Sequence, residues 1–235
     1  MEGTGGSRLV ALVPMRHHSE RVPGKNYRAL AGKPLYAHIL QTLQSCPAIG
    51  AVVVDTDSPI IREGVARAFP NVTLLERPDR LRGGETPTNA ILLNDVTIVE
   101  APWYLQTHCT NPFLRAETIT RAIARFLADL ETHDALFSVT RLQKRLWDAA
   151  SKPVNHDPHV LLRTQDLPPL FEENSCIYLF ERQAFLRTGS RLCERPQLFE
   201  IDALEAWDID EELDFTLAEQ MAIALARPGA RLGSS

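Results

Sequence analysis

The chain has 235 residues, of which 44% are hydrophobic and 23% are charged, the composition of an ordinary globular protein. Its formal net charge of −5 argues against a general affinity for nucleic acid or an anionic membrane surface. No apolar run approaches the ~20 residues of a membrane span, and the four cysteines include no C-x-x-C pair that would indicate a zinc site. We therefore expect a soluble cytoplasmic protein without nucleic-acid or membrane partners.

One domain, residues 8–226, is expected between two flexible tails. The first residues, MEGTGGS, have neither the basic nor the apolar region of a secretory signal, so residues 1–7 are predicted to be a tail and not a leader. Residues 227–235, RPGARLGSS, are expected to be equally unstructured.

Strand-like apolar runs and helical patterns alternate along the domain. The expected order is a strand from Val10, a helix ending before Pro47, a strand at 51–57, a helix at 59–69, a strand at 72–76, a helix whose first turn contains Pro87, a strand at 101–107, a helix at 117–130, a strand at 135–140, a strand at 174–180, a helix at 182–187, an edge strand at 197–201 and a last helix to Ala226. This alternation is typical of a three-layer, doubly wound α/β fold with a mostly parallel sheet.

The alternation stops between the strands at 135–140 and 174–180. The sequence there is polar and rich in proline, with one short strand expected at 160–163. We expect residues 147–172 to form a small β-rich extension inserted into the domain.

The loop after the first strand carries four cations, Arg16, Arg21, Lys25 and Arg28, together with Asn26. In open α/β sheets, ligands bind beyond the carboxyl ends of the strands, so this loop is placed to meet an anion. The Pro23-Gly24 turn leaves backbone N–H groups and the lysine free to converge on phosphate oxygens. A solvated basic loop is the alternative from charge alone.

Two acids near the carboxyl end, Asp208 and Asp210, are spaced so that both side chains of an extended strand point the same way. Such a pair suits Mg²⁺, which keeps waters and phosphate oxygens as its remaining ligands. The alternative is that Asp210 caps the following helix, with Asp214 interacting with the helix dipole.

The run R-x-x-S-x-R-x-P-x-K-N at 16–26, followed by L-x-G-K-P-L, resembles the motif of the CMP-sugar synthetases. Further matches follow in order along the chain: R-P-x-x-L at 77–81, Thr110 and Pro112 of an L-Q-P-T-S-P-L turn, R-x-Q-x-L-P at 163–168, the 174–179 strand in place of N-G-A-I-Y-I, and D-I-D-x-x-x-D at 208–214. The resemblance implies a nucleotidyltransferase with a glycosyltransferase-A-like fold. It also implies a homodimer in which the extension reaches the partner subunit.

In function, the resemblance implies transfer of CMP from CTP to an acidic sugar, such as sialic, legionaminic or pseudaminic acid or Kdo, with release of pyrophosphate. The implied catalytic residues are Arg16, Lys25, Asp208 and Asp210, the last two also binding Mg²⁺. The implied nucleotide-binding residues are Arg16, Ser19, Arg21, Lys25, Asn26, Arg77, Arg82 and Thr86, and the implied acceptor-binding residues are His108, Thr110, Arg163, Gln165 and Asn174. No general base is assigned.

Several departures from the family motifs bear on the acceptor. Trp147 stands where sialic-acid enzymes have a lysine, so the acceptor pocket differs or Lys144 or Arg145 supplies the cation. His17 and His18 replace smaller residues of the first loop. A second hypothesis keeps CTP but replaces the sugar with another small acid, such as a phosphonate.

Other departures are Glu85 in place of aspartate, Cys109 in place of proline and Ser175 in place of glycine. A third hypothesis, from a different class, is a nucleotide-binding module without catalysis. The phosphate-binding and metal-binding residues of the motif, which are intact here, argue against it.

Overall fold

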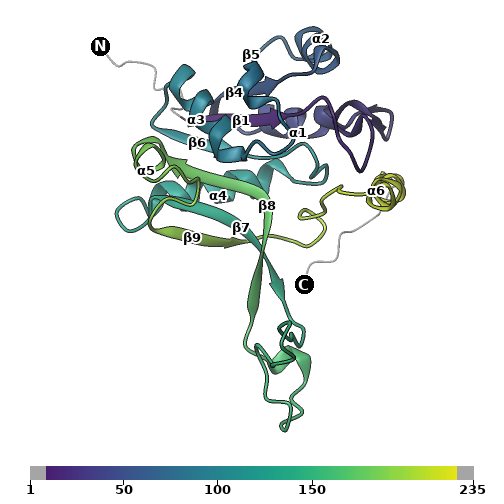
Figure 1. Cartoon of the computed structure of the whole chain (residues 1–235), viewed down its shortest axis with the longest axis vertical. Helices are drawn as coiled ribbons and strands as arrows, with labels where there is room; N and C mark the ends of the chain where they lie inside the picture. Colours follow the sequence, from purple (N-terminus) through teal and green to yellow (C-terminus); the bar gives the residue numbers. More distant parts are fainter. Residues whose placement is uncertain (1–8, 227–235) are drawn as a thin grey trace.

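The computed structural model describes residues 9–226, so the tails predicted at 1–7 and 227–235 lie outside the described residues. A seven-stranded sheet forms the centre, with helices on both faces and a two-stranded arm projecting from it (Figure 1). The strands of this sheet are β1 (Leu9–Met15), β4 (Ile49–Thr56), β5 (Val72–Glu76), β6 (Trp103–Gln106), β7 (Ala135–Leu142), β8 (Leu170–Glu181) and β9 (Pro196–Glu200). The helices are α1 (Leu35–Gln44), α2 (Pro59–Ala68), α3 (Thr88–Ile98), α4 (Ala116–Ala128), α5 (Arg182–Thr188) and α6 (Glu212–Leu225). Short elements are the 3₁₀ turns η1 (Lys25–Tyr27), η2 (Asp79–Leu81) and η3 (Thr164–Asp166), and a hairpin of β2 (Ala29–Leu30) and β3 (Lys33–Pro34).

The strand order is β5-β4-β1-β6-β8-β7-β9. Neighbouring strands are parallel except where β8 pairs antiparallel with β6 and with β7. The predicted doubly wound, mostly parallel sheet is therefore confirmed. The carboxyl ends of β5, β4, β1 and β6 meet at one edge, so the loops that follow these strands lie side by side there.

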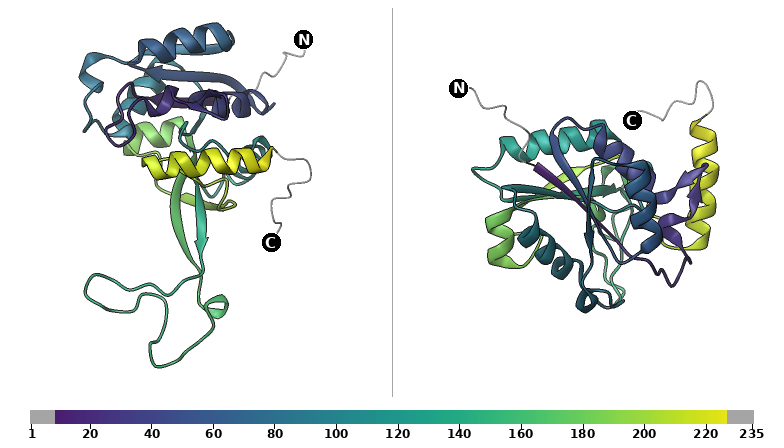
Figure 2. Two further views of the ribbon diagram at one scale, coloured as in Figure 1. Left: turned by 90° about the vertical axis from the view of Figure 1, so that its right-hand side faces the viewer. Right: turned by 90° about the horizontal axis from the view of Figure 1, so that it is seen from above.

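Alternation of apolar residues along β1 fills the two faces of the sheet. Leu9, Ala11 and Val13 belong to the core under α1, α2 and α4. Val10 and Leu12 belong to a second core under α3 and α5. Side chains of successive strand residues point to opposite faces, which is why one apolar strand can serve both layers. Figure 2 shows helices covering the sheet from both sides.

A third apolar cluster holds α6 at the side of the domain. Phe215 of α6 packs with Val22 of the first loop, Leu30 of β2 and Ile209. Figure 2 shows α6 lying beside the β2–β3 hairpin, away from the sheet. This cluster brings the carboxyl-terminal segment against the loop that follows β1. Within residues 9–226, no helix combines the length and the apolar character needed to cross a membrane.

Residues 143–169 connect β7 to β8 and project far from the sheet (Figure 1). The extension thus starts earlier than the predicted residue 147, and residues 170–172 already belong to β8. The strand predicted at 160–163 is absent, and that prediction is wrong. No strand pairing is found for residues 160–163, and Leu161 is 89% exposed.

A buried charged network ties β4, β5 and α3 together. Arg77, which follows β5 and is only 1% exposed, donates from Nε to Asp55 Oδ1 over 2.5 Å. Asp95 of α3 contacts the same aspartate, and its burial together with the Asp55 charge raises the pKa of Asp95 to about 8. The Oδ2 atoms of Asp55 and Asp95 have no other partner, so one proton between the two carboxyls satisfies both.

We expect stability to fall as the pH rises from 4 to 8, because the unfolded chain loses the Asp95 proton near pH 3.8 while the folded chain keeps it to about pH 8. Asp95→Asn stays neutral and donates to Asp55 at every pH, so it should flatten this slope. The free energy of unfolding, measured with urea at pH 5, 6.5 and 8, checks the change. Asp79→Asn, at a side chain that is 91% exposed, is the control. An unchanged slope in Asp95→Asn would contradict the shared proton.

Candidate active site

A cavity of about 730 Å³ opens at the edge of the sheet where the parallel strands end. Its walls come from the loops after β1, β4, β5 and β6, from β8, and from the segment before α6. Most of the predicted site residues line it, namely Arg16, Ser19, Arg21, Lys25, Asn26, Arg82, His108, Thr110, Asp208 and Asp210. A shallower depression of about 450 Å³ lies between α1 and the loop before α4, and none of the predicted residues line it.

The first loop is folded tightly enough to present its cations on one side. Gly24 has φ 67°, and a Cβ there would lie 2.8 Å from a ring carbon of Tyr27, so only glycine fits this turn. Asn26 donates from Nδ2 to the Arg16 carbonyl oxygen over 2.8 Å, closing the loop on itself. Asn26 Oδ1 in turn accepts from Cys109 Sγ after β6, at 3.2 Å. The predicted role of Asn26 near the phosphates is compatible with this bracing position.

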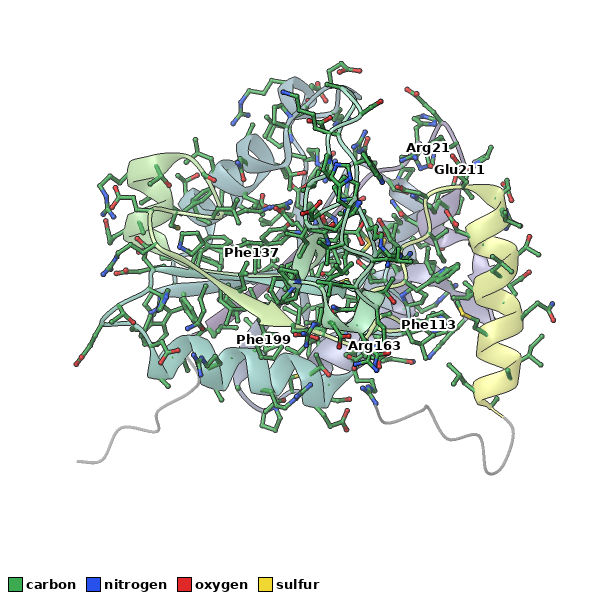
Figure 3. The ribbon with its side chains drawn as sticks, turned by 90° about the horizontal axis from the view of Figure 1, so that it is seen from below. Arg21, Phe113, Phe137, Arg163, Phe199 and Glu211 are labelled. Carbon is green, nitrogen blue, oxygen red and sulfur yellow. The ribbon has the colours of Figure 1, made fainter. Side chains whose placement is uncertain are left out.

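Lys25 and Arg21 bind the segment that precedes α6. Lys25 Nζ donates to the Ile209 carbonyl oxygen over 2.6 Å and lies 3.5 Å from Asp210 Oδ1. Arg21 Nη2 donates to the same Asp210 oxygen over 2.8 Å. Figure 3 shows Arg21 beside the start of α6, where Glu211 is labelled. Two cations and one acid, far apart in sequence, thus meet at the cavity wall.

The loops after β1 and β5 are joined by Arg16. Its Nη1 donates to the Gly84 carbonyl oxygen over 3.0 Å. Arg82 donates from Nε to the Arg77 carbonyl oxygen over 2.9 Å and so shapes the second loop. Guanidinium groups from both loops therefore line the same cavity, as the sequence predicts.

Asp210 is not the cap of α6. Glu211 is the N-cap, and Asp214 Oδ2 accepts from the backbone nitrogens of Glu211 at 2.8 Å and Asp210 at 3.0 Å. This reciprocal capping arrangement satisfies the helix end without the carboxylate of Asp210. The Asp210 side chain is therefore left to the cavity, and the helix-cap alternative fails for this residue.

Asp208 supplies the second carboxylate. Burial and, to a lesser extent, the charge of Asp210 raise its pKa, while a hydrogen bond with Thr110 opposes the shift. Its Oδ1 is buried and has no hydrogen-bond partner in the part of the chain described. No group of three or more His, Cys, Asp or Glu side chains within residues 9–226 could hold a metal. Two carboxylate oxygens, one of them unpartnered, fit a cation such as Mg²⁺ that takes its other ligands from water and phosphate.

Gln106 sets the protonation of His108. Arg191 donates from Nη1 to Gln106 Oε1 over 2.6 Å, so the amide nitrogen is the atom that faces His108 Nε2 at 3.1 Å. The ring therefore accepts at Nε2 and carries its proton on Nδ1. Burial, followed by the charges of Arg191 and Lys25, lowers the pKa of His108 to about 4. His108 is a neutral hydrogen-bonding group at the cavity wall.

Two predicted nucleotide contacts do not line the cavity. Arg77 is buried in its ion pair with Asp55 and does not line the cavity, although the sequence predicts it as a nucleotide contact. Thr86 closes a turn, donating its backbone nitrogen to the Gly83 carbonyl oxygen over 3.1 Å. Thr88, the first residue of α3, lines the cavity in its place.

Asn174, predicted as an acceptor contact, does not line the cavity and instead bonds neighbouring strand residues. Its Oδ1 accepts from Ser138 Oγ at 2.5 Å and its Nδ2 donates to Thr140 Oγ1 at 3.0 Å. These bonds hold the irregular register between β7 and β8. The next residue, Ser175, has φ 59° and lines the cavity instead.

Arg163 and Gln165 lie on the projecting connection and do not line the cavity of their own chain. Arg163 pairs with Asp166 over 2.6 Å. Figure 3 looks from below, so that the connection carrying Arg163 overlaps the sheet in that view. Lys144 and Arg145, the other candidate cations for the acceptor, lie on the same connection and are likewise absent from the cavity wall. Within one chain, the cavity is lined by other residues.

Arg191 is the main functional candidate that the sequence did not predict. It lies in the loop between α5 and β9, where no motif or periodicity marks it, and it reaches the cavity only through the fold. Asp57 and Ser175 also line the cavity without having been predicted. The serine could have been found, because it replaces the family glycine in a strand that matches the family motif at Asn174, Ile177 and Tyr178.

Comparisons with known proteins agree with this geometry. A family model described as Cytidylyltransferase matches residues 10–227. CMP-N,N'-diacetyllegionaminic acid synthase of Legionella pneumophila is 27% identical, over 91% of this chain and 96% of the relative. N-acylneuraminate cytidylyltransferase A of Danio rerio is 25% identical over 92% of this chain, which spans only 51% of that relative.

Solved structures share the fold. A structure of CMP:2-keto-3-deoxy-manno-octonic acid synthetase complexed with CTP has a TM-score of 0.66 at 16% identity, covering 92% of this chain and 98% of its own. A 4-diphosphocytidyl-2C-methyl-D-erythritol synthase from Anaerococcus prevotii has a TM-score of 0.67 at 12% identity, covering 93% and 97%. With the family match extending over nearly the whole domain, the chain belongs to the cytidylyltransferase family.

Proposed function

We propose that this chain is a magnesium-dependent cytidylyltransferase that transfers CMP from CTP to a small acidic sugar and releases pyrophosphate. The observation that carries the proposal is the meeting, in one cavity, of the cationic loop after β1 with the Asp208 and Asp210 pair. Relatives named as legionaminic acid, acylneuraminate and 3-deoxy-manno-octulosonate enzymes support an acidic nine- or eight-carbon sugar as the acceptor.

In this reaction an acceptor hydroxyl oxygen forms a bond to the α-phosphorus of CTP. The bond between that phosphorus and the bridging oxygen breaks, pyrophosphate leaves with its electron pair, and the hydroxyl proton passes to solvent. Alignment and neutralisation of the phosphoryl charge provide most of the catalysis in such transfers. Arg16 and Lys25 hold the triphosphate, and Arg21 and Arg82 add positive charge from the two neighbouring loops.

Asp208 and Asp210 would hold Mg²⁺, which supplies charge neutralisation for the phosphates when bound. Without ligand, the Asp210 carboxylate is neutralised by Arg21 and Lys25. Arg21 and Lys25 are therefore already in place before the nucleotide arrives. The entering phosphates then replace Asp210 as the anionic partner of these two cations. Such preorganised charge needs little rearrangement during the reaction.

The phosphonate hypothesis loses part of its basis. His17 is engaged outside the cavity, where its Nδ1 lies 2.8 Å from Ser58 Oγ and its ring stacks on Tyr27. Trp147 lies on the projecting connection, residues 143–169. His18 still lines the cavity. A phosphonate acceptor and a non-catalytic module both remain as distinct outcomes of the assay below.

We expect pyrophosphate release with Mg²⁺ and CTP in the presence of one acid from a panel of sialic, legionaminic, pseudaminic and Kdo acids. UTP, ATP and GTP should be poor substitutes. Turnover with a simple phosphonate alone would show that the acceptor is a phosphonate and not a sugar acid. CTP binding without pyrophosphate release with any acceptor would contradict the proposed enzymatic activity.

Asp208→Asn tests the metal assignment in the same assay. Losing one of the two carboxylates should raise the Mg²⁺ concentration needed for half-maximal release by roughly 10-fold or more. Glu63→Gln is the control, since it removes an exposed acid of α2 outside the cavity. Identical magnesium dependence in Asp208→Asn and in the wild type would remove this residue from the metal site.

We also propose that two copies associate through the projecting connection. Exposed apolar side chains gather on it and at its base: Val154, Val160, Leu161, Leu162 and Phe171. Apolar surface of this kind is normally covered by another protein surface. Sedimentation at micromolar concentration should give a dimer, and Leu161→Glu should weaken it. A wild-type monomer at every concentration would contradict this arrangement.

A further inference from the structure

Arg191 is held rigidly at the cavity wall. Its guanidinium carbon lies 3.5 Å from the centre of the Tyr178 ring, in cation–π contact. Its Nη1 donates to Gln106 Oε1 over 2.6 Å, and its backbone nitrogen donates to Asn89 Oδ1 over 3.4 Å. Ring, amide and backbone contacts from β8, β6 and α3 thus fix one side chain from three directions.

The charge of Arg191 has no carboxylate in contact with it. Arg21, by comparison, lies 2.8 Å from Asp210, and Arg28 lies 2.7 Å from Glu212. Glu173 acts on Arg191 only through its charge, because its carboxylate accepts the Tyr178 hydroxyl instead. Arg191 therefore forms no ion pair with any residue from 9 to 226. A guanidinium has five N–H donors, so an anionic ligand in the cavity can still bind it.

The position of Arg191 separates it from the triphosphate-binding loops. The strand order places β1 between β4 and β6, with β5 on one side and β8 on the other. Arg82 and Gly84 follow β5, whereas His108 follows β6 and Tyr178 belongs to β8. Arg191 joins this second group through Gln106. The β6–β8 side is left for the acceptor once the β1 and β5 loops hold the nucleotide.

We propose that Arg191 binds the carboxylate of the acceptor and sets the preference of the site for acids. A planar guanidinium matches a carboxylate with two parallel hydrogen bonds, which a lysine ammonium cannot do. Tyr178 and Gln106 are positioning residues that hold the guanidinium. The inference rests on the proposed function, since it assigns one end of the same cavity to the second substrate.

Arg191→Met should raise the KM for the acid acceptor by roughly 10- to 100-fold and leave the KM for CTP unchanged, because it removes a charged hydrogen bond to one substrate only. The probes are N-acetylneuraminic acid and Kdo, each as free acid and as methyl ester. The wild type should discriminate against the ester, and Arg191→Met should lose most of that discrimination. Arg187→Met, at an exposed arginine of α5 outside the cavity, is the matched control.

Tyr178 separates a positioning role from a purely structural one. Tyr178→Phe keeps the ring under the guanidinium and should keep the acceptor KM near that of the wild type. Tyr178→Leu removes the ring and should raise the acceptor KM while the KM for CTP stays the same. An equal rise in the KM for the acceptor and the KM for CTP in Tyr178→Leu would indicate a general packing defect. That result would contradict the positioning role.

The failure of this inference is distinct from the failure of the proposed function. Wild-type turnover together with an unchanged acceptor KM in Arg191→Met would overturn the assignment of Arg191 alone. Absence of turnover in the wild type would overturn the proposed function. In that case calorimetric titration of each acid into the wild type and into Arg191→Met still tests the assignment of Arg191. Weaker binding of the acid to the variant supports the assignment. Equal binding to both proteins, or no binding to the wild type, overturns it.

Discussion

The contact of Lys25 with Ile209 and Asp210 joins the two halves of the site. Its hydrogen bond to Ile209 spans 184 positions of sequence, and the neighbouring bond from Arg21 to Asp210 spans 189. Beneath these bonds, Val22 and Phe215 pack in one apolar cluster with Ile209. The polar contacts place cations against acids, while the apolar cluster excludes water from the base of the joint. These contacts hold the loop after β1 and the acidic segment on the wall of the same cavity.

Before any substrate is present, the charges of the site are only partly paired. Asp210 is shared by Arg21 and Lys25, whereas Asp208 keeps one buried oxygen without a partner and Arg191 has no acid in contact with it. In our account these two incomplete groups are the ones that ligands complete, a metal cation at Asp208 and an acceptor carboxylate at Arg191. Burial makes each unpaired group costly, which favours binding of the matching charge.

Much of the fold and part of the site could be predicted from local patterns. The apolar run of β1 and the alternation of helices and strands predict the parallel sheet. The basic residues after β1 predict the cationic wall of the cavity. The spacing of Asp208 and Asp210 put both carboxylates at the cavity. These features depend on neighbouring residues or on a general rule of sheet topology. They can therefore be predicted from the sequence alone.

The remaining features depend on contacts between distant segments. Arginine is a common phosphate ligand, but Arg77 forms a buried ion pair with Asp55 inside the core. Asn174 matches a family position, yet the irregular pairing of β7 with β8 uses its amide. Arg191 carries no local pattern at all, and Tyr178 and Gln106 reach it only after the sheet has formed. The strand expected at 160–163 has no pairing partner within residues 9–226.

Pyrophosphate release by Lys25→Ala, compared with Lys33→Ala, tests whether the contact of the first loop with the acidic segment supports catalysis. Lys25 contacts the acidic segment at the cavity, whereas Lys33 bonds Gln41 and lines only the shallower depression. With thermal unfolding measured alongside to exclude a folding defect, Lys25→Ala should reduce the rate by about 10²–10³-fold, the loss expected for one charge-stabilising group. Lys33→Ala should stay close to the wild type. A folded Lys25→Ala variant with wild-type pyrophosphate release would contradict the account of the joint between the loop and the acidic segment.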